Sequence, residues 1–178
     1  MNTLLENKRI RLRAMEPEDL EVLYLWENDP RHWKVSQTLI PFSKFTLKQF
    51  IKQSTNDLYT TRQFRLMIIR RNDDHPLGAI DLFDFDPYHK RGGVGILIHD
   101  ENDRNKGYAS EALQLFKEYC FGHLKLHQLY CHIATDNQAS LRLFTGNGFT
   151  VIGEKKEWLF NGNGYSSEWM LQCINPSS

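Results

Sequence analysis

The chain has 178 residues, of which 40% are hydrophobic and 25% are charged, and its 22 basic residues balance its 22 acidic residues. This length and composition are typical of a globular protein, so we expect one domain spanning residues 1–178. Without a basic excess a nucleic-acid partner is not expected. A membrane is not expected either, because no apolar run approaches the roughly 20 residues that span a bilayer.

The N-terminus and the cysteines indicate the compartment. Residues 1–13 contain no apolar core of signal-peptide length, which predicts a cytoplasmic protein. Cys120, Cys131 and Cys173 each lie in an apolar stretch and have no metal-like spacing. We therefore expect three buried, reduced thiols and no bound metal.

The first third of the chain predicts one strand and two helices. Alternating apolar and basic residues predict a strand over Ile10–Arg13. A helix is expected to open at Glu16–Asp19, where Pro17 and acidic residues occupy the first turn, and to end at Asn28–Pro30. A second, short helix is expected over Thr46–Ser54.

The rest of the chain predicts a mixed sheet. Strands are expected at Phe64–Ile69, Leu77–Phe85 and Gly93–His99, and their short connections favour an antiparallel meander. Helical spacing and strand-length runs then alternate, which places helices on both faces of the sheet. The expected elements in this half are helices at Ser110–Phe121 and Asn137–Asn147, and strands at Leu129–Ala134, Phe149–Glu154, Glu157–Phe160 and Glu168–Ile174.

The segment that points most clearly to a ligand is Asp103–Ser110, which follows a predicted strand and opens a predicted helix. Arg104, Gly107 and Ala109 form the pattern R-x-x-G-x-A. Small residues let a ligand approach the backbone, and the amides at a helix N-terminus carry the positive end of the dipole, so the loop suits a pyrophosphate. Taken alone, the segment is equally compatible with a plain turn between a strand and a helix.

Further motifs occur in a fixed order around this loop, at Arg9–Arg13 with Glu16–Leu20, Leu77–Ile80, Gly95–Ile98, Thr135–Ser140 and Leu143–Phe149. Together they resemble the GCN5-related N-acetyltransferase (GNAT) superfamily over roughly residues 8–174. The most similar subgroup holds ribosomal-protein N-terminal and spermidine acetyltransferases. This order disfavours a dinucleotide-binding domain, whose Gly-rich loop would follow the first strand.

The resemblance implies an α/β fold with a mixed, mostly antiparallel sheet of about seven strands, helices on both faces, and a cleft where the fourth and fifth strands splay apart. It also implies acetyl-CoA as co-substrate and direct transfer of the acetyl group to a primary amine. A backbone N–H of the fourth strand, near Ile96, Leu97 or Ile98, is expected to stabilise the charge on the carbonyl oxygen. The residues that it assigns to CoA binding are Ile96, Leu97, Ile98, Arg104, Asn105, Lys106, Gly107, Tyr108, Ala109, Ser110, Asn137, Ser140 and Phe144. For Asn137 the alternative is a helix N-cap, and for Ser140 an inert position in the first turn.

Two catalytic positions depart from the family pattern. Relatives often have a Tyr that protonates the leaving thiolate, where this chain has Phe144, which we expect to pack against the CoA. The nearest subgroup often has a Glu as base, where this chain has Gly93. Alternation along a strand predicts that Asp81 and Asp84 face opposite sides, so at most one faces the cleft unless a bulge intervenes. The remaining candidates for the base are Glu27, Asp29, Asp81, Asp84, His89 and His99.

The acceptor side is expected to involve aromatic residues. Trp26 and Trp33 either line an amine site through cation–π contacts or belong to the core at a helix end. Tyr165 and Trp169 are expected to close the opposite wall. The expected acceptor is a protein N-terminus, a polyamine or a small amine, and the expected assembly is a monomer or a homodimer. The missing Tyr and Glu leave a second hypothesis, a catalytically weak acyl-CoA-binding regulatory module.

Overall fold

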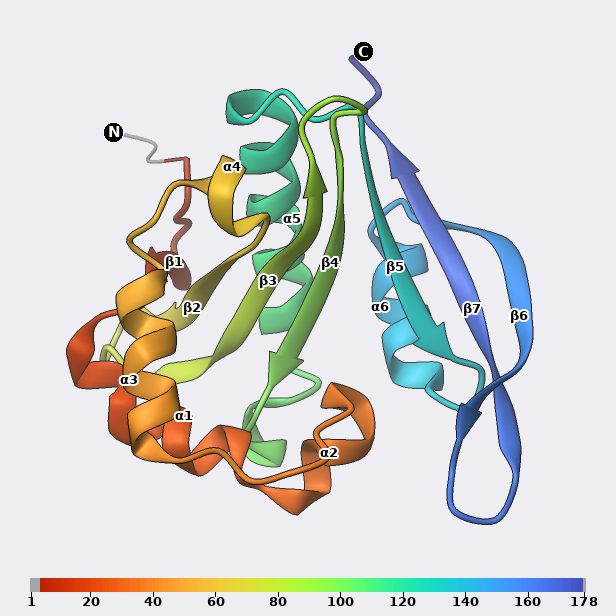
Figure 1. The fold of residues 1–178 in the computed structure, drawn as a ribbon. Coiled ribbons are helices and arrows are strands. Elements are labelled where there is room, and N and C mark those ends of the chain that lie inside the picture. The colour runs from red at the N-terminus through yellow and green to blue at the C-terminus, as the bar shows by residue number, and fades with distance from the viewer. Residues whose placement is uncertain (1–3, 178) are drawn as a thin grey trace.

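The computed structural model describes residues 4–177, and Figure 1 shows them as one twisted sheet with helices on both faces. Residues 1–3 and 178 of the expected domain lie outside this described part. Its seven strands have the order β1-β2-β3-β4-β5-β7-β6. The strands are β1 (Ile10–Ala14), β2 (Phe64–Arg70), β3 (Pro76–Asp86), β4 (Arg91–Ile98), β5 (Gln128–Ala134), β6 (Thr150–Phe160) and β7 (Tyr165–Ile174).

Helices pack against both faces of the sheet (Figure 1). The helices are α1 (Leu20–Glu27), α2 (Pro30–Ser36), α3 (Lys44–Gln53), α4 (Leu58–Thr61), α5 (Tyr108–Glu118) and α6 (Gln138–Gly146). Short helical turns lie at Pro17–Asp19, Glu101–Asp103 and Tyr119–His123, the last of them a π turn that continues α5. The helices α1 and α3 pack on one face, and α5 and α6 pack on the other.

The side chains of β2 explain how one strand serves both layers. Successive side chains of a strand point to opposite faces. Accordingly, Leu66 and Ile68 belong to the core under α5, whereas Met67 and Ile69 pack with the residues of α1 and α3. The apolar run that predicts a strand is thus a strand buried on both faces. The three cysteines are free and buried, as expected.

The strands β4 and β5 are the only parallel neighbours in the described sheet, and they pair over three residues each. The paired segments are Arg91–Gly93 and Gln128–Tyr130. Glycine is required at this junction, because a Cβ on Gly93 would lie 2.2 Å from the Phe83 ring. Beyond Gly93 the strands separate, while β4 stays paired with β3 and β5 with β7. This is the expected splayed arrangement.

Several predicted boundaries were wrong. The break at Asn28–Pro30 ends one helix but also begins α2, with Asp29 accepting a hydrogen bond from the Arg31 amide as N-cap. The helix α4 was not predicted. The two strands expected at Phe149–Glu154 and Glu157–Phe160 are a single strand, β6, whose register shifts between Lys155 and Leu159 but whose neighbour β7 runs along its whole length.

Candidate active site

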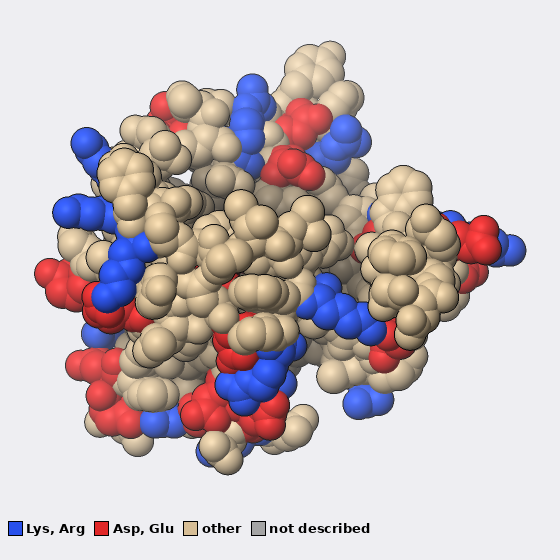
Figure 2. Space-filling view, turned by 60° about the horizontal axis from the view of Figure 1, so that its bottom comes forward, with Lys and Arg blue, Asp and Glu red and all other residues tan. Residues whose placement is uncertain are grey.

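A large cavity fills the space between the diverging strands. It has a volume of about 1210 Å³ and is lined by β4, β5, α2, α6 and the β6–β7 hairpin. The ion pair between Lys34 on α2 and Asp136 after β5, at 2.7 Å, crosses it from one side to the other. In Figure 2 the hairpin stands out as a separate lobe beside the main body of the molecule. The cavity therefore lies between two lobes, which the paired ends of β4 and β5 join at one end.

The edge of β4 that faces this cavity carries unpaired backbone groups. The His99 amide donates to the Leu77 carbonyl of the β3 side at 3.0 Å. Hydrogen-bonded pairs alternate along an antiparallel ladder, so the amide of Leu97 also faces β3, and the amides of Ile96 and Ile98 face the cavity edge. The expected N–H donor is thus narrowed to Ile96 or Ile98, and Leu97 is not available for that role.

The predicted phosphate loop lies at the far end of this edge, outside the cavity lining. Asn105 has a φ of 59° and Gly107 a φ of 87°, and Gly107 is the N-cap of α5. The left-handed conformation at Gly107 lets the chain enter the helix with its first amides uncovered, which is the arrangement expected for an anion site. Asn105, Lys106, Gly107 and Ser110 are exposed, and Tyr108 and Ala109 are half-buried.

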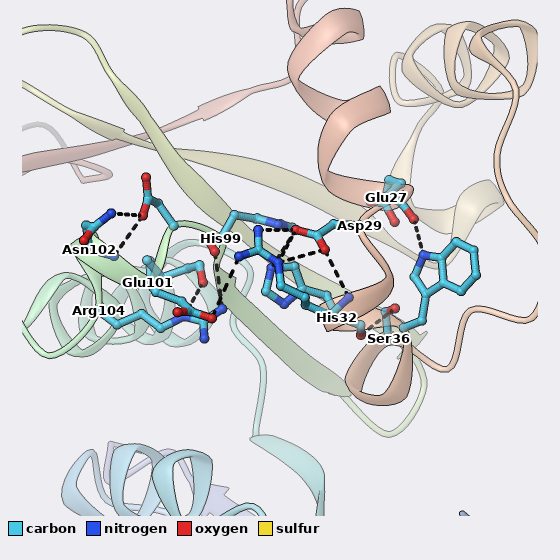
Figure 3. Close-up of polar contacts among 12 residues, drawn as sticks. Glu27, Asp29, His32, Ser36, His99, Glu101, Asn102 and Arg104 are labelled. Carbon is cyan, nitrogen blue, oxygen red and sulfur yellow. Dashed lines mark hydrogen bonds and ion pairs between the residues drawn. The ribbon is translucent and has the colours of Figure 1, made fainter. Parts of the chain in front are cut away.

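Arg104 has a structural role that the sequence did not predict. Its Nε donates to the Ile98 carbonyl at 3.0 Å and its Nη2 to the His99 carbonyl at 3.3 Å, so it ties the loop to the end of β4 (Figure 3). Arg9 is the cation that sequence reasoning missed here. It lies over the Tyr108 ring at 4.5 Å, pairs with Glu111, and donates to the Lys106 carbonyl at 2.9 Å.

The residues expected on α6 do line the cavity. Asn137 Oδ1 accepts the Ser140 amide at 3.1 Å, so Asn137 is the N-cap that was the alternative to a ligand contact, and it faces the cavity as well. Phe144 is 4% exposed and its ring meets Phe149 edge-on at 5.0 Å. Asn147 Nδ2 donates to Ser110 Oγ at 3.0 Å, which joins the end of α6 to the start of α5.

Two carboxylates share one half-buried guanidinium on the main-body side of the cavity. Arg65 donates from Nε and Nη2 to Asp81, at 2.7 and 3.0 Å, and from Nη1 to Glu27. All three side chains line the cavity. The sequence feature that could have identified Arg65 as a site residue is its position as a charged residue at the start of an apolar run. The cluster carries an excess of one negative charge, which suits an ammonium group.

The aromatic part of this wall is built around His99. Trp26 stacks on its ring at 4.2 Å, and the buried His32 meets the ring edge-on at 5.1 Å. His32 and His99 lie side by side in Figure 3. The His99 Nδ1 and His32 Nε2 atoms are buried without a hydrogen-bond partner. Burial, and then the nearby His32, Arg65 and Arg104, lower the pKa of His99 to about 3, so its ring is uncharged at neutral pH.

Three of the six candidates for the base lie outside the cavity lining. Asp84 is exposed, with a φ of 49° in the bulge where the pairing of β3 and β4 shifts, and His89 is exposed in the following turn. Asp29 is held by hydrogen bonds from Arg31, which keep its pKa far below the usual range. The residues that remain are Glu27, Asp81 and His99.

The residues of β7 that were expected to form the opposite wall of the cavity are the neighbours of those that do. Ser166 and Glu168 of β7 face the cavity, so the alternating residues Tyr165 and Trp169 point to the other side. Tyr165 is 66% exposed and Trp169 packs against the core instead. Trp26 and Trp33 both line the cavity, and the Trp33 indole donates to the Glu27 carbonyl at 2.9 Å.

Comparison with known proteins decides the family. A family model described as an acetyltransferase (GNAT) domain matches residues 9–150. The chain belongs to the GNAT acetyltransferase family. This confirms the resemblance drawn from the sequence motifs, and the chain is accordingly an N-acetyltransferase that transfers an acetyl group to an amine.

The chain is similar to curated GNAT proteins over most of its length. It is 29% identical over 155 residues to the uncharacterized N-acetyltransferase p20 of Bacillus licheniformis, covering 86% of each chain. It is 27% identical over 160 residues to the spermidine N(1)-acetyltransferase of Escherichia coli K12, covering 86% of this chain and 80% of the relative.

Solved structures share the GNAT fold. The spermidine N-acetyltransferase of Vibrio cholerae in complex with CoA and spermine superimposes with a TM-score of 0.85 at 21% identity, covering 95% of this chain and 97% of the other. A structure of that enzyme described as dodecameric has a TM-score of 0.78 at 20% identity, covering 95% of each chain. The seven-stranded mixed sheet predicted from the sequence is thereby confirmed.

No helix within residues 4–177 is long and apolar enough to cross a membrane. No group of three or more His, Cys, Asp and Glu side chains in the same range is arranged to hold a metal ion.

Proposed function

We propose that this GNAT protein uses acetyl-CoA to acetylate a primary amine held between Trp26, Glu27 and Asp81. The observation that carries the proposal is the unpaired edge of β4, which opens into the same cavity as the Glu27–Arg65–Asp81 cluster. One wall then offers backbone donors for a thioester and carboxylates for an ammonium. The names of the spermidine acetyltransferases support an amine as the acceptor.

The donor side fits an acyl-CoA. An extended pantetheine can add to a free strand edge as another strand would, using the backbone groups of Ile96 and the amide of Ile98. The Ile98 carbonyl already accepts from Arg104. The amides of residues 104–110 and the N-terminus of α5 suit its pyrophosphate, and Gly107 leaves the backbone open for a close approach. Asn137, Ser140 and Phe144 face the same space from α6. When bound, acetyl-CoA supplies the acetyl group as a thioester.

The reaction needs a neutral amine. The bound ammonium gives up one proton and becomes the neutral amine, its nitrogen forms a bond to the thioester carbonyl carbon, and the carbon–sulfur bond breaks. The nitrogen then releases a second proton to water and becomes the amide nitrogen. The Ile96 or Ile98 N–H stabilises the negative charge that develops on the carbonyl oxygen. Phe144 has no proton to give, so the sulfur leaves as a thiolate and takes its proton from water, which a thiol with a pKa of about 8.5 allows.

The proton of the ammonium leaves through the polar residues of the same wall. Glu27 and Asp81 receive the ammonium, because each carboxylate keeps lone pairs beyond those that Arg65 uses. His99 is uncharged at neutral pH and does not repel a cation. We assign cation binding to the two carboxylates and release of the proton to water in contact with them.

Turnover with a panel of primary amines tests the proposal. Acetyl-CoA is incubated with each amine, the free thiol is measured, and mass spectrometry looks for the amine enlarged by one acetyl group. Thiol release that depends on both the amine and the enzyme is the expected result. Tight acetyl-CoA binding with no acetylated amine would instead support the regulatory module.

The oligomeric state of this protein and its cellular compartment remain predictions. The Vibrio cholerae relative is described as a dodecamer. For this chain we keep the prediction of a monomer or a homodimer in the cytoplasm. Light scattering of the purified protein checks the assembly, and a mass above two chains would contradict it.

A further inference from the structure

Almost every charged side chain that lines the cavity forms an ion pair with another one. They form the Glu27–Arg65–Asp81 cluster and two separate ion pairs, so that four carboxylates face three cations. The two pairs are Lys34 with Asp136 and Lys155 with Glu168. The Glu27–Arg65–Asp81 cluster holds the one carboxylate in excess, and the cavity therefore offers a place for one added positive charge.

A second cationic group on the acceptor would find no free carboxylate. Glu168 is buried and pairs with Lys155, and separating the two would leave a charge uncompensated inside the protein. Lys34 holds Asp136 on the other side of the mouth. An added cation near either pair would meet a carboxylate that a lysine already neutralises, so a polycation gains one ion pair and no second one.

Exposed apolar side chains stand on both lips of the cavity mouth, beside the Lys34–Asp136 pair. Leu39, after α2, is 93% exposed, and Trp158 and Phe160, on β6, are 60% and 69% exposed, yet all three line the cavity. In Figure 2 uncharged side chains cover the face of the hairpin lobe that comes forward. Exposed apolar side chains grouped at a cavity mark a surface that binds an apolar ligand.

We propose that the acceptor is a monoamine, with one ammonium group on an uncharged and largely apolar body. This inference rests on the proposed amine acetylation and specifies its substrate class. The ammonium binds Glu27 and Asp81 beside Trp26, and the body of the amine packs between Leu39 and the Trp158–Phe160 lip. The class differs from spermidine, the substrate named for several relatives.

A matched pair of amines tests the inference. Hexylamine and the hexane diamine with an amino group at each end have the same carbon chain and differ by one ammonium. Steady-state kcat/KM is measured for both, and for spermidine, with acetyl-CoA saturating. We expect hexylamine to be favoured by about tenfold or more, a difference of about 1.4 kcal/mol in transition-state binding. Equal or better use of the diamine or of spermidine would overturn the inference and leave amine acetylation standing, whereas no acetylation of any amine would contradict the proposed function itself.

A gain-of-function variant supplies a second test. Lys34→Gln removes an exposed lysine and frees the Asp136 carboxylate at the mouth. It should raise kcat/KM for the diamine relative to hexylamine. Lys48→Gln, an exposed change on α3 away from the cavity, is the matched control and should leave the ratio unchanged. If Lys34→Gln leaves the ratio unchanged as well, the charge argument fails.

Discussion

Arg65 organises the acceptor side of the cavity. Burial on its own lowers the pKa of Arg65, but the charges and hydrogen bonds of Asp81 and Glu27 outweigh it and raise the pKa above its usual value. The guanidinium thus stays charged and fixes both carboxylates in one orientation. A lysine could not replace it, because an ammonium lacks the planar fork that reaches two carboxylates.

Asp81→Asn removes the negative charge in excess and keeps the shape of the side chain. The KM for the amine should rise about tenfold or more, because the ammonium then loses a charged partner worth about 1.4 kcal/mol or more. The KM for acetyl-CoA should not change. Asp84→Asn, three residues along β3 and outside the cavity lining, is the control. Equal effects of the two substitutions would contradict the assignment of Asp81.

His99 should make the stability of the protein depend on pH. Its pKa falls from 6.5 to about 3 on folding, mainly through burial. Between these values the unfolded chain holds a proton that the folded chain does not, so the free energy of unfolding should decrease as the pH falls through this window. Thermal unfolding at a series of pH values checks this. A His99→Asn variant should lose less stability than the wild type over the same range, and identical slopes would argue against a buried neutral imidazole.

Two substitutions of Phe144 distinguish a packing role of this side chain from a role in proton donation. Phe144→Tyr should leave turnover within a few fold, or raise it modestly where the new hydroxyl reaches the sulfur. Phe144→Ala should cost about 3–5 kcal/mol of stability, because the buried ring packs on Phe149. Both are measured by steady-state kinetics and thermal unfolding. A Tyr variant that binds CoA normally but loses a hundredfold in activity would show that Phe144 does not lie beside the sulfur.

At the scale of elements, the loop before α5 is proposed to bind the pyrophosphate of CoA. A side chain at Gly107 is strained by the φ of 87°, and its Cβ would lie 3.6 Å from Arg9 Nη1. Gly107→Val should therefore weaken CoA binding at least about tenfold, or about 1.4 kcal/mol, with the fold retained. Gly122→Ala, where nothing lies within 4 Å of an added Cβ, is the control for titration calorimetry. Unchanged affinity in Gly107→Val would mean that the phosphates bind elsewhere.

The elements that the sequence predicts well are those with a strong local signal. The strands β2 to β5 stand close to their expected bounds because each is a strand-length apolar segment, and α5 does so because its apolar residues repeat at about 3.6 residues. The helix α2 was missed although Asp29 and Pro30 form an N-cap and first-turn pair, since the same residues also end α1. The divergence of β4 and β5 followed from the family motifs and not from any period.

Site residues were harder to predict because they depend on register and on long-range pairs. The sequence does not fix which face of β7 meets the cavity, so Tyr165 and Trp169 were assigned instead of Ser166 and Glu168. Arg65 could be recognised as a site residue only after β2 and β3 were paired, because Arg65 lies opposite Asp81 in that register. The N-cap of α6 at Asn137, by contrast, is local and was foreseen as an alternative.

At the scale of the whole molecule, the two lobes meet through a short strand pair, through the Asn147–Ser110 hydrogen bond between α6 and α5, and through the Lys34–Asp136 bridge. In the proposed function, the acyl donor and the amine both enter between these lobes. A ligand that contacts β4 in one lobe and α6 in the other can bind only to the folded state, because only folding brings the two elements together. Such a ligand must stabilise the fold in proportion to its concentration.

Thermal unfolding with and without acetyl-CoA tests this central claim most directly. A ligand that binds only the native state adds about 2.7 kcal/mol at roughly 100 times its Kd. We predict that the unfolding midpoint of the wild type rises with acetyl-CoA and with CoA, and that the rise is largely lost in Gly107→Val. A midpoint that does not move at millimolar acetyl-CoA or CoA would contradict the account.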